Sequence, residues 1–317
     1  MKLSSSGALT STLPSALRFD GQIAIVTGAG GGLGRQHALA LARRGAKLVI
    51  NDVGGGSGSA SAADAVVQQI RAAGGEAIAN NASVTDADAM LAMAGQAMAQ
   101  WGRIDILVNN AGILRDRSFS NMSLADFRSV IDVHLMGSVH CIKAVWEIMK
   151  AQKYGRIVLT TSSSGLYGNF GQANYGAAKM ALVGLMQTLA LEGSKYQINV
   201  NCLAPSAATQ MTQDLMTQDD LALLTPQSVS PAIIYLASKE APTRTILCAG
   251  AGAFASAHIT LTAGVFIGDI PEAPEQLLER AEQVLEREGE TVPGAGIEQS
   301  RGEINKARLS SIQSWNR

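Results

Sequence analysis

The chain has 317 residues, of which 47% are hydrophobic and 16% charged, so it is neither a disordered chain nor a coiled coil and is long enough for one large domain or two small ones. Its 25 Lys and Arg residues balance 26 Asp and Glu residues, and the net charge of −1 leaves no basic footprint for nucleic acid or an anionic membrane. No segment is apolar for about 18 residues, so we expect no membrane-spanning helix. Enzymes dominate the class of soluble globular proteins with this composition.

The termini and the cysteines indicate the compartment. Cys141, Cys202 and Cys248 have no Cys-x-x-Cys or Cys/His spacing, so we expect small core residues in a reducing compartment, with no disulfide and no metal site. Residues 1–18 are rich in Ser and Thr and contain no signal-peptide core, which indicates a mobile leader. Residues 314–317 are not the peroxisomal Ser-Lys-Leu signal, so we expect a cytoplasmic protein.

From Gly21 onward, short β-branched runs alternate with longer helical stretches, which predicts an α/β fold with a doubly wound parallel sheet and helices on both faces. The expected strands are Gln22–Thr27, Ala46–Asp52, Glu76–Asn80, Ile104–Asn109, Arg156–Thr161 and Ile198–Leu203, with Ala257–Gly264 as a candidate for the last strand. The expected helices are Leu33–Arg44, Ala62–Ala73, Asp86–Trp101, Leu124–Ala151 and Asn174–Gly193. Ser123 and Asp126 form a near capping box at the start of the fourth helix.

The character of the sequence changes after Gly268. We therefore place the main domain at residues 19–268 and a C-terminal extension at residues 269–317. Within the extension, Gln276–Glu288 has apolar residues at helical spacing, which predicts an amphipathic helix. We expect this helix to pack on its own domain or on a neighbouring subunit; a helix that binds another partner is the alternative.

A glycine-rich turn, Thr27–Gly34, joins the first expected strand to the first expected helix. Glycines at this place permit a tight turn and a close approach of the backbone to a pyrophosphate. The helix that follows presents free N–H groups and the positive end of its dipole to a phosphate. We therefore expect a dinucleotide site formed by Gly28, Gly32, Leu33 and Gly34.

Asp52 ends the second expected strand, 18 residues after Gly34. A carboxylate at this spacing accepts hydrogen bonds from the adenosine ribose and repels a 2′-phosphate, which favours NAD over NADP. Arg35 is a signal in the opposite direction, because a nearby arginine can accept the phosphate of NADP. In the alternative interpretation, Asp52 only begins the loop Val53–Ser59.

Three residues in the second half of the domain predict acid–base chemistry. Ser162 follows the fifth expected strand, Tyr175 comes 13 residues later, and Lys179 lies one helical turn further on the same face. A tyrosine that acts as a base near neutral pH needs a pKa about three units below its usual ~10, which corresponds to roughly 4 kcal/mol of stabilisation of the phenolate. A lysine ammonium and an oxidised nicotinamide, both cationic, would supply this stabilisation. Ser162 would hold the reacting oxygen in line with Tyr175. Each residue alone could serve the core or a helix cap, but their joint spacing favours catalysis.

Together, Thr27-Gly28-x3-Gly32-x-Gly34, Asn109-Asn110-Ala111-Gly112, Ser162 and Tyr175-x3-Lys179 resemble the short-chain dehydrogenase/reductase family over residues 19–268. The resemblance implies a seven-stranded Rossmann sheet, NAD(P) binding, hydride transfer between a secondary alcohol and a ketone, and a homodimer or homotetramer. It also implies the roles of the residues. Tyr175 would be the acid/base, Ser162 would orient the substrate, and Lys179 would bind the nicotinamide ribose and lower the pKa of Tyr175. Asn110, Ala111 and Gly112 would brace the cofactor and the sheet.

Within that family, several stretches resemble the D-3-hydroxyacyl-CoA dehydrogenase domain of the type 2 peroxisomal multifunctional enzymes. They are Thr27–Arg35, Asn51-Asp52, Gly112–Phe119, Lys153–Ile157 and Gly168–Lys179. This resemblance implies an acyl-CoA or steroid substrate. Arg115 and Arg117 are candidates to bind the phosphates of coenzyme A, and pairing with Asp116 or other carboxylates to fix the loop is the alternative.

The sequence departs from the family pattern at three places. His134 stands where most members have an asparagine that anchors a proton-relay water, so it is either a substituted relay residue or a buried histidine bonded to a carbonyl. Ser83, next to Val84, replaces an aspartate near the adenine. Pro205-Ser206 replaces Pro-Gly, which leaves Thr209 open as a carboxamide contact at the start of an expected lid, Thr209–Leu224.

The sequence therefore predicts an NAD-dependent oxidoreductase acting on a (3R)-hydroxyacyl-CoA. The alternatives are a 17β-hydroxysteroid dehydrogenase, an NADPH-dependent 3-ketoacyl reductase, which Asp52 disfavours, and a non-catalytic protein that senses dinucleotides. The complete set Ser162, Tyr175 and Lys179 disfavours the sensor, because a sensor has no use for the acid/base tyrosine.

Overall fold

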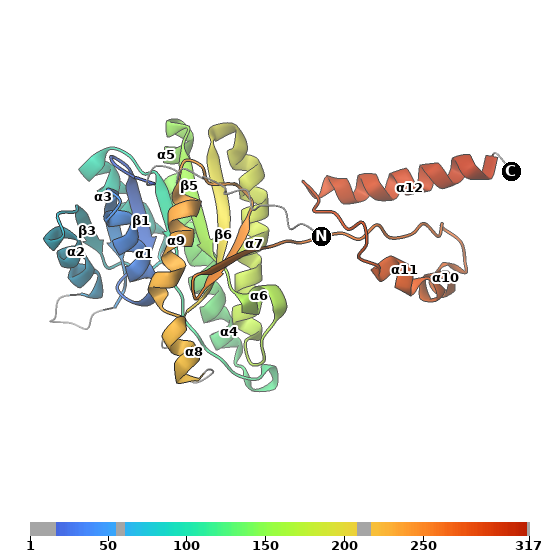
Figure 1. Cartoon of the computed structure of the whole chain (residues 1–317), viewed down its shortest axis with the longest axis horizontal. Helices are drawn as coiled ribbons and strands as arrows, with labels where there is room; N and C mark the ends of the chain where they lie inside the picture. The colour runs from blue at the N-terminus through green and yellow to red at the C-terminus, as the bar shows by residue number, and fades with distance from the viewer. Residues whose placement is uncertain (1–16, 55–60, 208–216, 316–317) are drawn as a thin grey trace, which may run out of the picture. The chain divides into compact units, whose positions relative to one another are not determined.

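Eight strands form one sheet in the computed structural model of the chain, which describes residues 17–54, 61–207 and 217–315 (Figure 1). Their order is β3-β2-β1-β4-β5-β6-β7-β8, and each pair from β3 to β7 is parallel. The order reverses between β1 and β4, so the crevice at the carboxyl ends of these two strands is the place where such sheets bind ligands. The strands are β1 (Ile23–Thr27), β2 (Lys47–Asn51), β3 (Ala77–Asn80), β4 (Ile106–Asn109), β5 (Gly155–Thr160), β6 (Ile198–Ser206), β7 (Ile246–Gly250) and β8 (Ala253–Ala257).

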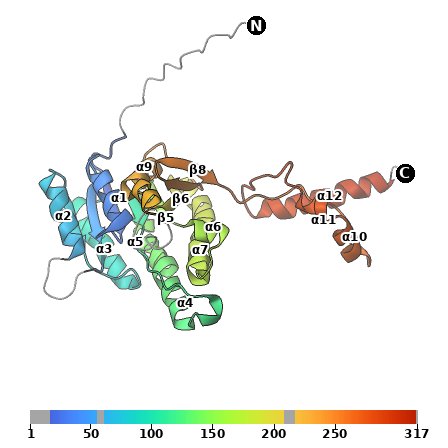
Figure 2. The same cartoon turned by 60° about the horizontal axis from the view of Figure 1, so that its bottom comes forward.

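Helices cover both faces of this sheet (Figure 2). On one face α1 (Gly32–Ala42) packs against α2 (Ala62–Ala72) and α9 (Pro226–Ala237). On the other face α5 (Gly137–Gln152) and α7 (Ala173–Gly193) lie against the central strands, and α3 (Ala87–Trp101) packs on α5. Every residue of β1, β4 and β5 is buried, because both faces are covered, and this explains their near-continuous apolar sequence. The predicted α/β fold with a doubly wound parallel sheet is confirmed.

The fourth expected helix, Leu124–Ala151, is interrupted in the structure. Helix α4 (Leu124–Ile131) begins at Ser123, whose hydroxyl accepts a hydrogen bond from the Asp126 N–H at 3.0 Å, and a π-helical turn, η2 (Asp132–Met136), separates it from α5. Such turns are frequent at functional sites. No sequence pattern predicted α9 or the short helices α6 (Ser163–Tyr167) and α8 (Gln218–Leu223).

The expected last strand, Ala257–Gly264, is wrong. The sheet ends with β7 and β8, which are joined by Ala251 and Gly252 at φ 49° and 78°. Two consecutive positive φ values form the type of turn that joins antiparallel neighbours, so β8 closes the sheet as the second strand of a hairpin. This hairpin has no strong local signal in the sequence, because alanine and glycine have low β-propensity.

The chain divides into one compact unit that ends at Ser256 and a second that begins at Ala257, whereas the sequence analysis placed the boundary after Gly268. In the second unit the single helix expected at Gln276–Glu288 is wrong, because the chain turns at Arg280 and forms α10 (Ala273–Glu279) and α11 (Ala281–Leu285). A third helix, α12 (Ile297–Trp315), was not predicted because its sequence is mostly polar and has no apolar periodicity. Leu261 and Thr291 exchange two backbone hydrogen bonds that hold the unit together.

None of the helices in the described part of the chain is long and apolar enough to span a membrane. All three cysteines are unpaired, and Cys141 and Cys202 are buried.

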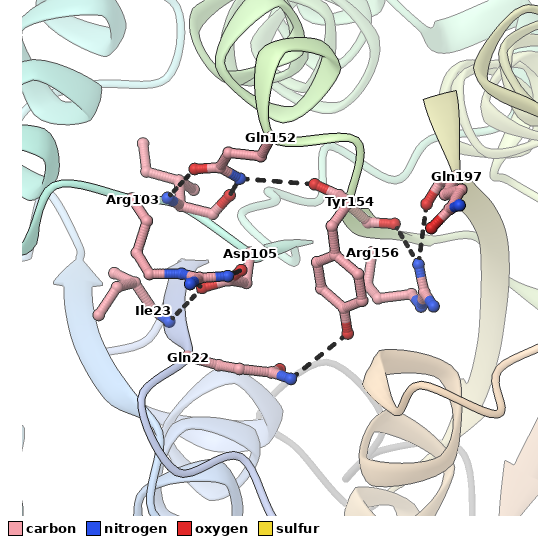
Figure 3. Close-up of polar contacts among 10 residues, drawn as sticks. Gln22, Ile23, Arg103, Asp105, Gln152, Tyr154, Arg156 and Gln197 are labelled. Carbon is pink, nitrogen blue, oxygen red and sulfur yellow. Dashed lines mark hydrogen bonds and ion pairs between the residues drawn. The ribbon is translucent and has the colours of Figure 1, made fainter. Parts of the chain in front are cut away.

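Polar side chains gather at the amino ends of β1, β4 and β5, the edge of the sheet opposite the crevice (Figure 3). Asp105 is fully buried and accepts hydrogen bonds from the Ile23 N–H at 2.9 Å and from the Arg103 guanidinium. Arg156 is buried over the Tyr154 ring and donates at 2.8–3.1 Å to four backbone carbonyls, those of Gly155, Gln197, Ser238 and Lys239. Because two of these carbonyls lie just beyond α9, this single side chain attaches the end of α9 to the sheet.

We expect Arg156→Met to lower the free energy of unfolding by roughly 2–4 kcal/mol, because two buried and two partly buried hydrogen bonds to carbonyls lose their charged donor. Urea denaturation measures the change. Arg43→Met is the matched control, since Arg43 is exposed, and it should stay within about 0.5 kcal/mol of the wild-type value. A loss of less than about 1 kcal/mol for Arg156→Met would show that the carbonyls find other donors.

Candidate active site

The glycine-rich turn lies between β1 and α1 at the carboxyl edge of the sheet. Gly28 has φ 61°, and a Cβ on it would lie 2.7 Å from the Cα of Ala111, so only glycine fits there. Helix α1 follows, and its N-cap, Gly31, makes no side-chain capping bond. The first N–H groups of α1 therefore have no capping side chain, as an anion site at a helix N-terminus requires.

Asp52 is joined to this turn. Its carboxylate accepts hydrogen bonds from the Gly30 N–H at 2.8 Å and from the Gly54 N–H at 2.7 Å. A Cβ on Gly30 would lie 2.8 Å from the Asp52 carboxyl carbon, so glycine at position 30 makes room for the carboxylate. Asp52 thus lies directly after β2 and beside the glycine-rich turn.

Asn110 and Thr27 join β1 to β4 at the point where the strand order reverses. The Asn110 side-chain amide donates to the carbonyls of Thr27 and Gly28 at 3.1 and 3.0 Å, and the Thr27 hydroxyl accepts from the N–H groups of Asn110 and Ala111 at 3.1 Å. Asn110 and Ala111 therefore brace the sheet, while Gly112 makes room for a side chain described below.

Two buried polar groups at the same edge have no hydrogen-bond partner among the described residues. They are the side-chain amide of Asn109 at the end of β4 and the hydroxyl of Thr160 at the end of β5. Buried polar groups without partners are rare in folded proteins, and they mark places where a ligand or water completes the bonding. The glycine-rich turn, the Asp52 carboxylate and these two groups fit the polar surface of a dinucleotide.

The structure brings Ser162, Tyr175 and Lys179 together beside this edge. Ser162 caps α6, Tyr175 lies in the first turn of α7, and the Lys179 ammonium lies 5.4 Å from the centre of the Tyr175 ring. Lys179 is buried, and its Nζ donates to the Thr160 carbonyl at 2.5 Å. The predicted spacing of four residues between Tyr175 and Lys179 thus places both side chains on one face of α7.

The electrostatics of this group differ from the sequence prediction, in which Lys179 lowers the pKa of Tyr175. Burial raises the pKa of Tyr175, a hydrogen bond with Ser162 lowers it, and the Asp116 carboxylate raises it further. Burial also lowers the pKa of Lys179 to about 7, so the charge that would stabilise a phenolate is itself weakened. With these residues alone, Tyr175 is a protonated phenol at neutral pH, the form that donates a proton.

His134 lies on the π-helical turn and meets the edge of the Tyr175 ring, with ring centres 5.2 Å apart. Its Nε2 lies 2.8 Å from the Ile113 carbonyl, and its Nδ1 is buried without a partner among the described residues. Burial lowers the pKa of His134 to about 3, so its ring is neutral. The contact with Ile113 is the carbonyl-bonded histidine of the sequence analysis, and the position beside Tyr175 is compatible with the relay.

The remaining predicted contacts are less informative. The Ser83 hydroxyl is bonded to the Thr85 hydroxyl at 2.8 Å, Val84 is buried, and Pro205 continues β6 opposite Ala249. Leu33 lies in the first turn of α1. Thr209 and the first half of the expected lid, residues 209–216, lie outside the described residues.

The loop that follows β4 carries Arg115, Asp116 and Arg117, and all three are exposed. Arg115 lies 3.8 Å from the Asp126 carboxylate, which is the pairing with a carboxylate that the alternative interpretation expected. Asp116 itself accepts a hydrogen bond from Gln172. Arg117 has no side-chain hydrogen bond or ion pair with a described residue, which leaves its guanidinium available to a ligand.

Three residues that the sequence did not identify as site residues connect this loop to α6 and α7; they are Gln172, Asn174 and Ser164. Their only signal was their position within the stretch Gly168–Lys179, and no residue type or spacing indicated their partners. The unpartnered amide of Asn109 was also missed as a site residue.

Comparisons with known proteins agree with this geometry. The family model described as short chain dehydrogenase matches residues 22–220. The peroxisomal multifunctional enzyme type 2 of Mus musculus is 51% identical over 229 residues, which cover 71% of this chain and 31% of that enzyme.

Two solved structures are also similar. The full-length peroxisomal multifunctional enzyme type 2 of Drosophila melanogaster has a TM-score of 0.77 at 38% identity, covering 94% of this chain and 50% of that one. A 7α-hydroxysteroid dehydrogenase in complex with NADH and 7-oxo glycochenodeoxycholic acid has a TM-score of 0.68 at 30% identity, covering 74% of this chain and 95% of that one. This chain thus spans half or less of the length of the two multifunctional enzymes.

We expect Gly112→Ala to lower the free energy of unfolding by roughly 1–3 kcal/mol, because the new Cβ would overlap the buried His134 ring. Gly95→Ala is the matched control. Its Cβ meets open space in the middle of α3, so it should raise the free energy of unfolding by about 0.5–1 kcal/mol. Urea denaturation measures both, and equal effects of the two substitutions would contradict the described position of His134.

Proposed function

Because the chain belongs to the short-chain dehydrogenase family, we propose that it is an NAD-dependent oxidoreductase that interconverts a (3R)-hydroxyacyl-CoA and its 3-ketoacyl-CoA. The observation that carries the proposal is the position of Tyr175. Its partly buried phenol lies among Ser162, Lys179 and His134, at the sheet edge where the glycine-rich turn and Asp52 meet. A non-catalytic dinucleotide sensor has no need for such a group of residues.

Each of the site residues has a separate role in the proposed reaction. A bound nicotinamide dinucleotide supplies the hydride acceptor for the alcohol, or the hydride donor for the ketone. In oxidation Tyr175 takes the hydroxyl proton as the hydride leaves the carbon, and in reduction Tyr175 returns a proton to the oxygen. Ser162 holds that oxygen through its hydroxyl. Since burial raises the pKa of Tyr175, oxidation should become faster with rising pH, as the phenolate form becomes populated.

Asp52 supports NAD as the cofactor. Its carboxylate is fixed beside the glycine-rich turn by the N–H groups of Gly30 and Gly54, where it would accept from ribose hydroxyls and repel a 2′-phosphate. Arg35, the signal for NADP, donates to the Gln69 side chain at 2.8 Å. That bond gives the guanidinium a partner other than a phosphate, which disfavours the NADPH-dependent reductase.

The loop after β4 supports a coenzyme A ester as the substrate. Arg115 and Arg117 are exposed beside Phe119, which is 76% exposed, and the Arg117 N–H donates to the Gly171 carbonyl next to Phe170, which is 91% exposed. Guanidinium groups suit phosphates, and exposed aromatic rings suit an acyl chain. A free 17β-hydroxysteroid is the second candidate, favoured by the similarity to a hydroxysteroid dehydrogenase structure.

Assembly and compartment are part of the proposal. Partly buried Trp146 and exposed Leu191 lie together beside Tyr196 on the surface formed by α5 and α7, which supports a homodimer or homotetramer. The unpaired cysteines support a reducing compartment, and we propose the cytoplasm.

We expect the wild-type protein to favour NAD over NADP in kcat/KM and Asp52→Asn to reduce that preference by about tenfold or more, which corresponds to ~1.4 kcal/mol. Asn keeps one acceptor oxygen for the Gly30 N–H of the turn, while the charge and the acceptor for the Gly54 N–H are lost. Steady-state kinetics with both cofactors measure the preference. A wild-type preference for NADP would contradict the role of Asp52.

We expect the protein to oxidise (3R)- but not (3S)-hydroxyacyl-CoA esters with NAD, and Tyr175→Phe to reduce kcat by about 10²- to 10⁴-fold without weakening NAD binding. Replacing Arg115 and Arg117 by Ala should raise KM for the ester while sparing a free 17β-hydroxysteroid, because only the ester carries phosphates. NADH absorbance follows all three reactions. Oxidation of the (3S) ester, or of the steroid alone, would overturn the acyl-CoA assignment.

A further inference from the structure

Gln172 connects three segments of the candidate site through one side chain. It is the N-cap residue of α7, and its side chain is buried. Its Nε2 donates to the Asp116 carboxylate at 2.6 Å, and its Oε1 accepts from the Ser164 hydroxyl at 2.7 Å and from the Asn169 amide at 3.1 Å. The amide therefore uses its donor side toward the loop after β4 and its acceptor side toward α6 and the turn before α7.

Each of these segments carries a group of the proposed reaction. The hydroxyl of Ser162, at the start of α6, accepts from the Ser164 N–H at 3.2 Å, so Ser164 joins Gln172 to the substrate-orienting serine. Tyr175 follows three residues after Gln172 in the first turn of α7. The loop after β4 holds His134 through Ile113, and its Arg115 carbonyl accepts from the buried Asn174 at 3.0 Å.

The chemistry of the contacts requires an amide at position 172. A carboxylate there would stand against the Asp116 carboxylate, and an apolar side chain would leave the Asp116, Ser164 and Asn169 contacts unmade. The charged and titratable groups that face Tyr175 are Asp116 on the loop, His134 on η2 and Lys179 on α7. Of these, only Asp116 is held by Gln172.

We propose that Gln172 is a positioning residue of the reaction, which holds the loop after β4 against α6 and α7 so that Ser162, Tyr175 and the Asp116 carboxylate keep a fixed arrangement around the substrate oxygen. The proposal rests on the proposed dehydrogenase function. Gln172 itself touches none of the reacting atoms; it acts through Ser164 and Asp116.

The kinetic test exchanges the hydrogen-bond donor and acceptor between positions 172 and 116. Gln172→Glu removes the donor and adds a charge facing Asp116, and it should reduce kcat by roughly ten- to 100-fold, since a misplacement of about 1 Å costs on the order of 10²-fold. Combining it with Asp116→Asn restores a donor–acceptor pair in the reverse sense and should recover most of kcat. Gln68→Glu, an exposed change on α2, is the matched control and should keep the wild-type kcat.

A merely structural role predicts a different pattern. The variants would then lower the melting temperature and the folded fraction but keep kcat per folded molecule and its pH profile. If Gln172→Glu keeps kcat within about twofold, or if the double variant is no better than the single one, the positioning role is wrong. Gln172→Met provides the same test with a neutral side chain if the charged variant does not fold.

A second measurement needs no substrate. Ultraviolet titration of tyrosinate, taken as the difference from Tyr175→Phe, reports the pKa of Tyr175. Because the Asp116 carboxylate raises this pKa, Asp116→Asn should lower it, and Gln172→Met should lower it in the same direction by releasing Asp116. The two changes together should lower it no further than Asp116→Asn alone.

The two measurements separate failure of the proposal from failure of the proposed function. If the wild-type protein oxidises no hydroxyacyl-CoA or hydroxysteroid, the function is wrong, while the titration still decides whether Gln172 holds Asp116 near Tyr175. If the wild-type protein is active but Gln172→Met leaves the pKa of Tyr175 unchanged, the positioning role is wrong and the function stands.

Discussion

The buried ammonium of Lys179 is the contact on which the rest of the site depends. Its Nζ donates to the Thr160 carbonyl at the end of β5, and its backbone carbonyl accepts from the Thr161 hydroxyl at 2.7 Å. Both the side chain and the backbone of Lys179 therefore attach α7 to the end of β5. A Cβ on Gly165 would lie 2.9 Å from the Lys179 Cβ, so α6 packs closely on the same point. Tyr175 and Ser162 are therefore fixed relative to each other through Lys179.

This burial sets the protonation of the site as well as its geometry. Withdrawal from water disfavours the charged forms of both Tyr175 and Lys179, which raises the pKa of the first and lowers that of the second. The protein residues alone thus hold a neutral phenol beside a weakened cation. A dinucleotide with an oxidised, cationic ring would shift this balance toward the phenolate, so binding of the cofactor and readiness of the base are coupled.

The two halves of the site are built differently. The half around the glycine-rich turn is held by backbone contacts and by the side chains of Asn110, Thr27 and Asp52, all close to the carboxyl ends of β1, β2 and β4. The half that would face the substrate is held by side-chain contacts centred on Gln172, between a loop and two helices. Backbone contacts at strand ends suit a cofactor that every turnover shares, whereas a side-chain network can differ between substrates.

The sequence by itself determined what local patterns encode. Alternation of apolar runs predicted six of the strands to within a few residues, the spacing of Gly28 to Gly34 predicted the turn before α1, and the interval of four residues placed Tyr175 and Lys179 on one face. These features depend on neighbours in the chain. The tertiary structure alone decided four other features: the pairing of Gln172 with Asp116, the packing of the His134 ring against Gly112, the turn at Arg280 and the hairpin of β7 and β8. The first two join residues far apart in the chain, and the hairpin and the turn lack a strong local signal. The tertiary structure also decided the directions of the pKa shifts of Tyr175 and Lys179, because burial is a property of the packed protein and cannot be derived from residue spacing.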